Sequence, residues 1–192
     1  MSDQGIHPAY IGILANLYQG QQARVLIDVA SRPFDICRGT KQGDPISPPI
    51  FNAVIEHVLK GVKSKWVANG WGVQLGWLPE DNLTNLRFAD DILLTARSLP
   101  QLKQMLSDVA VEVAKVGLEL HPDKTKILHN GIGYGSGATA AVVTGMNIEI
   151  LGVAASTTYL GRVLKLMDIH EEELKSIISK ALAKLGKCTG AS

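Results

Sequence analysis

The chain of 192 residues has little cysteine, no long apolar run and no excess of charge of one sign. Its two cysteines, Cys37 and Cys188, are far apart in the sequence, which favours free thiols in a reducing compartment over a disulfide framework. The scattered histidines speak against a zinc site. No stretch could cross a membrane, and the first ten residues lack the pattern of a signal peptide. We therefore expect an intracellular protein, nuclear or cytoplasmic, without a membrane partner.

What the sequence does contain is typical of one folded core. Apolar residues make up 46% of the chain, charged residues 19%, and the net charge is +1, which excludes an intrinsically disordered chain. The small positive excess does not distinguish a nucleic-acid-binding protein from a metabolic enzyme. Helical spacing and strand-like runs alternate irregularly along the sequence. They predict an α+β fold, with an antiparallel sheet covered by helices on one face.

Three helices are expected within the first 120 residues, and each has a recognisable end signal. The first spans residues 7–20 and the second starts at Ser47, a good N-cap residue, and ends near residues 70–72. The third follows a capping box formed by Ser98 and Gln101. Hairpins or strands are expected over four further stretches, which are residues 23–39, 82–96, 118–129 and 146–164. The first of these should turn around residues 31–33, and the third should be broken by a turn at Pro122 and Asp123.

Two adjacent aspartates, Asp90 and Asp91, lie between two apolar runs in the stretch "NLRFADDILLTA". Two carboxylates about 4 Å apart repel by about 1 kcal/mol in water and by more in a partly buried site. A solvated turn is the ordinary interpretation of such a pair. Here the run 92–94 starts directly after it, and Arg87 and Phe88 before it are not turn formers. This context weakens the solvated-turn interpretation and leaves the alternative of a hairpin tip whose charges are neutralised by a hard cation such as Mg²⁺.

Four ordered motifs resemble those of reverse transcriptases. "FADD" resembles the Y/F-x-D-D signature, and "RGTKQGDPISPPIFN" upstream of it resembles R-G-x-x-Q-G-D-P-x-S-P-x-x-F. "GLELHPDKTKIL" resembles G-L-x-x-N-x-x-K-T, and "TTYLGRVL" resembles the Y-L-G turn called the primer grip. The opening "GIHPAYIGILANLY" is similar to the helix before the Q-G-D-P loop in non-LTR, LINE-like retrotransposon enzymes. The resemblance implies an RNA-directed DNA polymerase palm that transfers nucleotides to a primer 3′-hydroxyl with two bound metal ions, Mg²⁺ or Mn²⁺, as cofactor.

The resemblance also implies roles for individual residues. Asp90 would bind metal directly with Asp91 as its companion, and Lys124 would protonate the leaving pyrophosphate. An ordinary surface lysine is an equally good interpretation of Lys124. RNA template, DNA primer and dNTP would be the partners. The remaining implied residues contact the nucleotide, the template or the primer: Gly39, Gln42, Gly43, Phe88 and Ala89, and in the primer grip Tyr159, Leu160 and Gly161.

Simpler interpretations stay open for the loops. The Q-G-D-P loop could be only a turn into a helix, and the primer grip could be a plain tight turn. In either case Asp44, Pro45 and Ser47 are expected to hold the loop and the helix start rather than to touch substrate. "GYGSGA", residues 133–138, loosely satisfies a dinucleotide-binding pattern, but no adequate helix follows it.

The sequence departs from the family in one respect. Reverse transcriptases carry a third catalytic aspartate in an F-D-x-x-x-A-F-D motif before the opening helix, and no equivalent is present in this sequence. The resemblance therefore implies a partial palm over residues 1–166 and the start of a thumb helix over 167–192. Fingers, first palm strand and most of the thumb would belong to a parent polyprotein. We expect the isolated chain not to polymerise. The alternatives are a non-catalytic nucleic-acid-binding palm remnant and an α+β domain without a nucleic-acid role.

Overall fold

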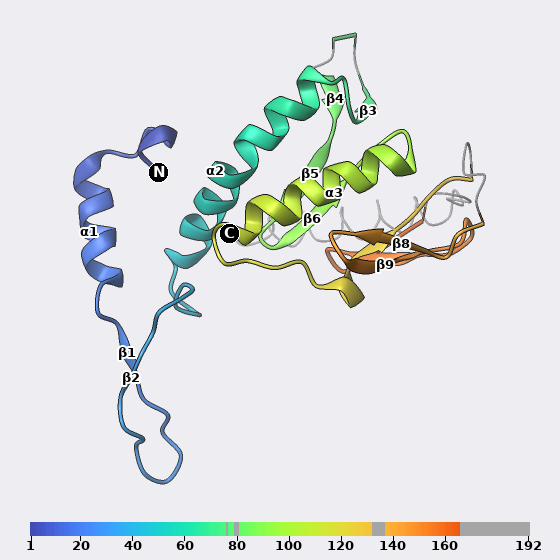
Figure 1. Cartoon of the computed structure of the whole chain (residues 1–192). Helices are drawn as coiled ribbons and strands as arrows, with labels where there is room; N and C mark the ends of the chain where they lie inside the picture. The colour runs from blue at the N-terminus through green and yellow to red at the C-terminus, as the bar shows by residue number, and fades with distance from the viewer. Residues whose placement is uncertain (76, 79–80, 132–136, 166–192) are drawn as a thin grey trace, which may run out of the picture. The chain divides into compact units, whose positions relative to one another are not determined.

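The computed structural model describes residues 1–75, 77–78, 81–131 and 137–165 (Figure 1). They form a mixed α+β structure, as expected, in two compact units. The first unit contains residues 1–96 and 108–119, and the second contains residues 97–107 and those from 120 onward. No helix within the described ranges is long and apolar enough to span a bilayer. The boundary expected at residue 166 and the helix expected after it lie at or beyond the end of the described residues.

The helices follow the expectations closely. They are α1 (Pro8–Tyr18), α2 (Ser47–Ala68) and α3 (Leu99–Ala114), with short 3₁₀ turns η1 (Ser2–Gln4) and η3 (Pro122–Lys124). The capping box expected before α3 is formed in part: Gln101 N donates to Ser98 Oγ, whereas Gln101 Oε1 accepts from Arg97 N instead of from Ser98 N. The start of α2 differs from the prediction. Ser47 is its first helical residue rather than its N-cap, which is Ile46.

The described strands form five small sheets rather than the single antiparallel sheet predicted. In the first unit, antiparallel pairs join β1 (Gln22–Ala23) to β2 (Phe34–Asp35), β3 (Val73–Gln74) to β4 (Asn82–Leu83), and β5 (Asn85–Phe88) to β6 (Asp91–Leu94). In the second, β8 (Ala140–Val143) and β9 (Met146–Ile150) form a hairpin, and β7 (Lys126–Ile127) pairs with β9 in parallel. A last hairpin joins β10 (Thr157–Tyr159) to β11 (Arg162–Leu164).

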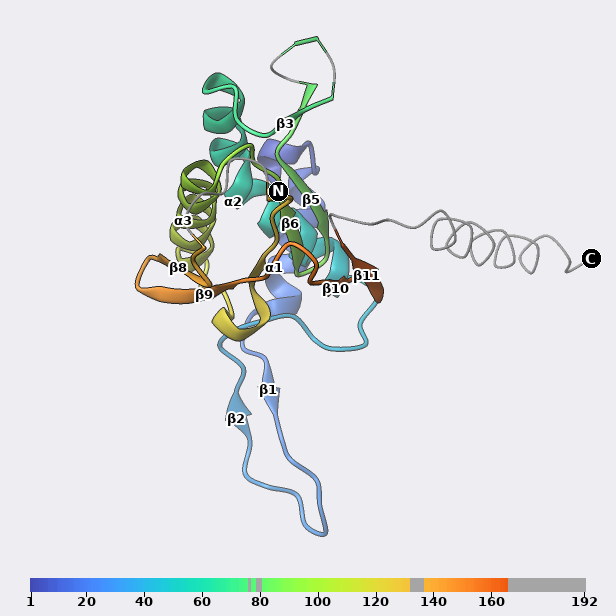
Figure 2. The same cartoon turned by 90° about the vertical axis from the view of Figure 1, so that its right-hand side faces the viewer.

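Two of the expected strand segments were placed wrongly. The stretch 118–121 is not a strand, because η3 and only the short β7 follow the turn at Pro122. The chain between β1 and β2 forms two segments that run side by side (Figure 1 and Figure 2), but it reverses between Leu26 and Ala30 instead of at residues 31–33. Ser31 N donates to Val25 O, which places Ser31 in the returning segment. Most of the glycine-rich stretch 133–138 lies outside the described residues.

The core of the first unit is built on α2. Its buried side chains recur at helical spacing and include Trp66, which is 0% exposed: Ile55, Val58, Leu59, Val62 and Trp66. Val109 and Val113 in the second half of α3 are also buried. Asp108 Oδ2 accepts a hydrogen bond of 3.0 Å from Trp66 Nε1, and its carboxylate forms an ion pair of 2.8 Å with Lys65. Polar contacts therefore join α2 to the second half of α3.

The first helix has its apolar side chains at helical spacing, but they are not buried. Tyr10, Ile13 and Leu17 are exposed. Polar contacts hold the preceding turn η1 to α2, since Gln4 Nε2 donates to Ala53 O over 2.7 Å. The helix prediction is thus confirmed for α1, whereas the burial that its pattern indicates is not found.

Candidate active site

The two aspartates lie at the tip of the hairpin formed by β5 and β6, as predicted. Phe88 and Asp91 are the last cross-strand pair, so the loop consists of Ala89 and Asp90. Ala89 has a φ of 52°, in the left-handed region that non-glycine residues seldom adopt. Two-residue hairpin loops require a positive φ at the first loop position. The sequence therefore places an alanine at a strained position directly beside the carboxylates.

The two faces of this hairpin differ in chemistry. Arg87 pairs with Ile92 across the hairpin, so their side chains lie on the same face. This face is directed toward α2, because Arg87 forms an ion pair with Glu56 of that helix. Phe88 and Asp91 share the opposite face with Leu86, and Phe88 is 66% exposed. An accessible aromatic ring thus lies beside Asp91 at the tip.

Both carboxylates at the tip are exposed, and neither makes a hydrogen bond or an ion pair with another described residue. Magnesium binds one or two protein carboxylates and keeps several waters, so two adjacent free carboxylates fit the ion chemically. Across the described ranges, no cluster of three or more His, Cys, Asp or Glu side chains could hold a metal ion. The tip therefore offers two of the oxygen ligands that a metal site needs.

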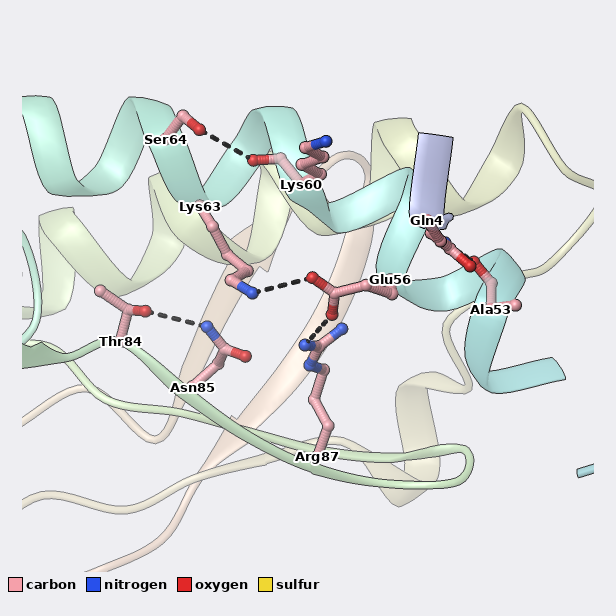
Figure 3. A network of polar contacts seen from close by, with 9 residues as sticks. All are labelled: Gln4, Ala53, Glu56, Lys60, Lys63, Ser64, Thr84, Asn85 and Arg87. Atoms are coloured by element: carbon pink, nitrogen blue, oxygen red, sulfur yellow. Dashed lines mark hydrogen bonds and ion pairs between the residues drawn. The ribbon is translucent and has the colours of Figure 1, made fainter. Parts of the chain in front are cut away.

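Helix α2 sets the direction of the hairpin. Near the C-terminal end of α2, Asn82 Nδ2 donates to Gly70 O over 3.1 Å. Later in the chain, in β5, Arg87 forms an ion pair with Glu56, which lies nearer to the start of the same helix (Figure 3). Strand β5 thus runs antiparallel to α2, and the tip with Asp90 points toward the N-terminal end of α2.

The carboxylate of Glu56 accepts hydrogen bonds from two cationic side chains. Its carboxylate binds Arg87 on one oxygen and Lys63 Nζ, at 3.1 Å, on the other (Figure 3). The hydrogen bond from Arg87 lowers the pKa of Glu56, and partial desolvation opposes that effect. Sequence analysis did not find this pair, because the two residues are 31 positions apart. The one available signal was an arginine between the apolar residues Leu86 and Phe88.

The Q-G-D-P loop lies directly before α2. Asp44 N donates to Lys41 O over 3.3 Å, which closes a turn around Gln42 and Gly43. Gly43 has a φ of 83°, as the third residue of a type II turn requires. Buried Ser47 donates to Lys41 O over 2.6 Å, and Asp44 Oδ1 accepts from Ile46 N over 3.1 Å. Asp44 and Ser47 therefore hold the loop in place, as predicted, while Gly39, Gln42 and Gly43 are exposed.

The hairpin tip and the Q-G-D-P loop both belong to the first unit, and α2 brings them together. The loop precedes the first turn of α2, and the hairpin runs toward that same end of the helix. The remaining predicted residues belong to the second unit. Lys124 is the exposed last residue of η3. Leu160 and Gly161, with φ of 52° and 71°, form the two-residue loop between Tyr159 and β11, a tight turn of type I′ character.

Comparison with known proteins gives this geometry a context. The chain matches the family described as reverse transcriptase (RNA-dependent DNA polymerase) over residues 5–164. It is 32% identical over 62% of its length to the Retrovirus-related Pol polyprotein from type-2 retrotransposable element R2DM of Drosophila melanogaster. It is 37% identical over 50% of its length to the corresponding polyprotein from type-1 retrotransposable element R2 of Popillia japonica, and 30% identical over 58% to that of Nasonia vitripennis.

The chain spans 10–12% of the length of these three relatives. The family match, by contrast, extends over most of the chain and includes the Q-G-D-P loop, the aspartate hairpin, the stretch around Lys124 and the turn after Tyr159. Because one match contains all these segments in their expected order, the chain belongs to the reverse transcriptase family.

Proposed function

We propose that this chain is the palm segment of an RNA-directed DNA polymerase from a non-LTR, LINE-like retroelement. We propose also that Asp90 and Asp91 hold a divalent metal ion beside the primer end. The observation that carries the proposal is the pair of exposed, unpaired carboxylates at a hairpin tip that is bound to α2. Reverse transcriptases generally use divalent ions, and the donor set suits Mg²⁺ or Mn²⁺.

Such an ion, when bound, supplies a Lewis acid that makes the primer 3′-hydroxyl a better nucleophile and neutralises phosphate charge. The residues of the chain bind this ion and orient the primer end. Asp90 in the loop is the direct ligand, and Asp91 at the start of β6 is its companion. The left-handed backbone at Ala89 gives the tight loop that places these two carboxylates side by side at the tip. The exposed ring of Phe88 forms a floor under the last primer nucleotide.

Two other segments complete the proposed substrate contacts. Gln42, with Gly39 and Gly43 on either side, faces the incoming dNTP and the template base, because glycine allows close approach of the backbone to a ligand. In the second unit, Lys124 donates a proton to the leaving pyrophosphate. The turn of Tyr159, Leu160 and Gly161 positions the DNA primer on its RNA template.

We also propose that the 192 residues on their own bind nucleic acid without polymerising. A misplacement of about 1 Å can lower a rate about a hundredfold, and two carboxylates from one tip constrain a pair of metal ions weakly. On this proposal the catalytic site is completed within the larger polyprotein. The same behaviour is expected of a palm remnant that only binds nucleic acid, so metal binding at the tip has to be measured directly.

The decisive experiment follows Mn²⁺ binding by paramagnetic broadening of backbone amide signals in the ¹⁵N-labelled chain. Broadening centred on residues 88–92, lost in Asp90→Asn and retained in the exposed-acid control Asp28→Asn, supports the proposed metal site. A tip unaffected by Mn²⁺ refutes it. Template-directed dNTP incorporation is measured in parallel with Asp90→Ala as the blank. Incorporation above this blank contradicts the inactivity of the isolated chain and leaves the metal site intact.

A further inference from the structure

The cationic side chain of Arg87 lies close in sequence to the two carboxylates. Arg87 precedes Asp90 by three residues, so their Cα atoms are separated by at most about 10 Å along the strand. Arginine is always charged and binds carboxylates through two parallel hydrogen bonds. A free Arg87 could therefore fold around the hairpin and occupy the oxygens that a metal ion needs.

The structure shows a different partner for this guanidinium. Arg87 is bound to Glu56 on α2, and its side chain is only 22% exposed. Strand alternation places it on the face opposite Phe88 and Asp91. The second cation on Glu56, Lys63, lies on α2 nearer to its C-terminal end and thus farther from the tip.

From this arrangement we infer that Glu56 is a positioning residue that keeps Arg87 away from Asp90 and Asp91, so that these carboxylates remain available to a divalent cation. The inference rests on the proposed metal site and adds a residue of α2 to it. Glu56 touches neither metal nor substrate and acts through Arg87. Its side chain is 41% exposed, so that its replacement by glutamine leaves the core of α2 intact.

The pair could also serve only to anchor the hairpin on α2, and the two roles predict different results. If anchoring alone matters, Glu56→Gln and Arg87→Gln break the same contact and weaken Mn²⁺ binding at the tip equally. If Glu56 holds back a competing cation, Glu56→Gln weakens binding whereas Arg87→Gln does not. The Glu56→Gln effect then disappears in the double variant, because no guanidinium remains to compete.

The test is a Mn²⁺ titration of the 192-residue chain, read from amide broadening at residues 88–92. We expect the Mn²⁺ concentration at half-broadening to rise roughly two- to fivefold in Glu56→Gln, the range of a partly exposed ion pair. We expect a smaller rise in Glu56→Asp, and wild-type values in Arg87→Gln, in the double variant and in the control Lys63→Gln. Unchanged amide shifts away from the hairpin verify that each variant is folded.

Two results overturn the inference. The first is a wild-type titration in Glu56→Gln, and the second is an equal weakening in Glu56→Gln and Arg87→Gln. Both leave the proposed metal site standing, because the wild-type chain still shows broadening at its tip. A wild-type chain without that broadening overturns the metal site and the role of Glu56 together, so the two failures are distinguishable.

Discussion

Trp66 is the side chain whose removal should cost the first unit most. It is 0% exposed, and its Nε1 donates to Asp108 over 3.0 Å. Replacing a buried tryptophan by alanine costs about 3–5 kcal/mol, compared with a total stability of about 5–15 kcal/mol for a typical domain. Trp66→Phe keeps most of the ring and loses the hydrogen bond to a carboxylate, which costs about 1.5–3 kcal/mol.

Urea unfolding followed by far-UV circular dichroism measures these losses. With a slope of about 2 kcal/mol per M, Trp66→Ala should lower the midpoint by about 2 M. Trp77→Ala is the matched control, because this tryptophan is 93% exposed and its loss should change stability by less than about 0.5 kcal/mol. Equal midpoints for the two alanine variants would refute the packing described for α2.

Three further predictions concern the parts that support the site. Gly72→Ala should destabilise the protein by about 1–3 kcal/mol, because a Cβ at this position would lie 2.5 Å from Leu83 O and the φ of Gly72 is 97°. Gly61→Ala should stabilise the protein, because a Cβ there meets open space. The urea midpoints of the two variants measure both changes. The pKa of Glu56 is lowered from 4.5 by its guanidinium partner, so the stability from that pair is complete above pH 4.5 and is lost as pH falls through the lowered pKa. The stability gap between wild type and Glu56→Gln should therefore narrow as pH falls below 4.5, and a gap that widens would contradict the sign. Leu160→Asn should keep or stabilise the turn, because asparagine tolerates the φ of 52°. If Leu160 contacts the primer, this variant should bind an RNA–DNA hybrid more weakly in fluorescence anisotropy. Unchanged binding would argue for a plain turn.

Local patterns predicted the local structure of this protein. Apolar spacing and cap residues indicated α1, α2 and α3, and one of the two hydrogen bonds expected of the capping box, from Gln101 N to Ser98 Oγ, is present in the structure. The hairpin with Asp90 and Asp91 at its tip was predicted from the two flanking apolar runs. These features depend on neighbours within a few positions, which is the range over which a sequence pattern carries information.

Contacts between distant residues were not predicted. The Glu56–Arg87 pair, the parallel pairing of β7 with β9 and the distribution of strands into separate small sheets all depend on how segments meet in space. Strand β8, which directly follows a glycine-rich stretch, was not predicted. The exposed face of α1 has the pattern of a buried one, so periodicity alone did not reveal its environment.

Helix α2 fixes the spacing between the Q-G-D-P loop and the aspartate hairpin. Ser47 contacts the loop and Glu56 contacts the hairpin, nine helical residues or about 14 Å apart along the axis. One inserted residue between them would rotate one contact by about 100° relative to the other and displace it by about 1.5 Å. Length changes in this part of α2 should therefore displace the hairpin relative to the loop, whereas insertions at the exposed reversal around residues 27–29 should be tolerated.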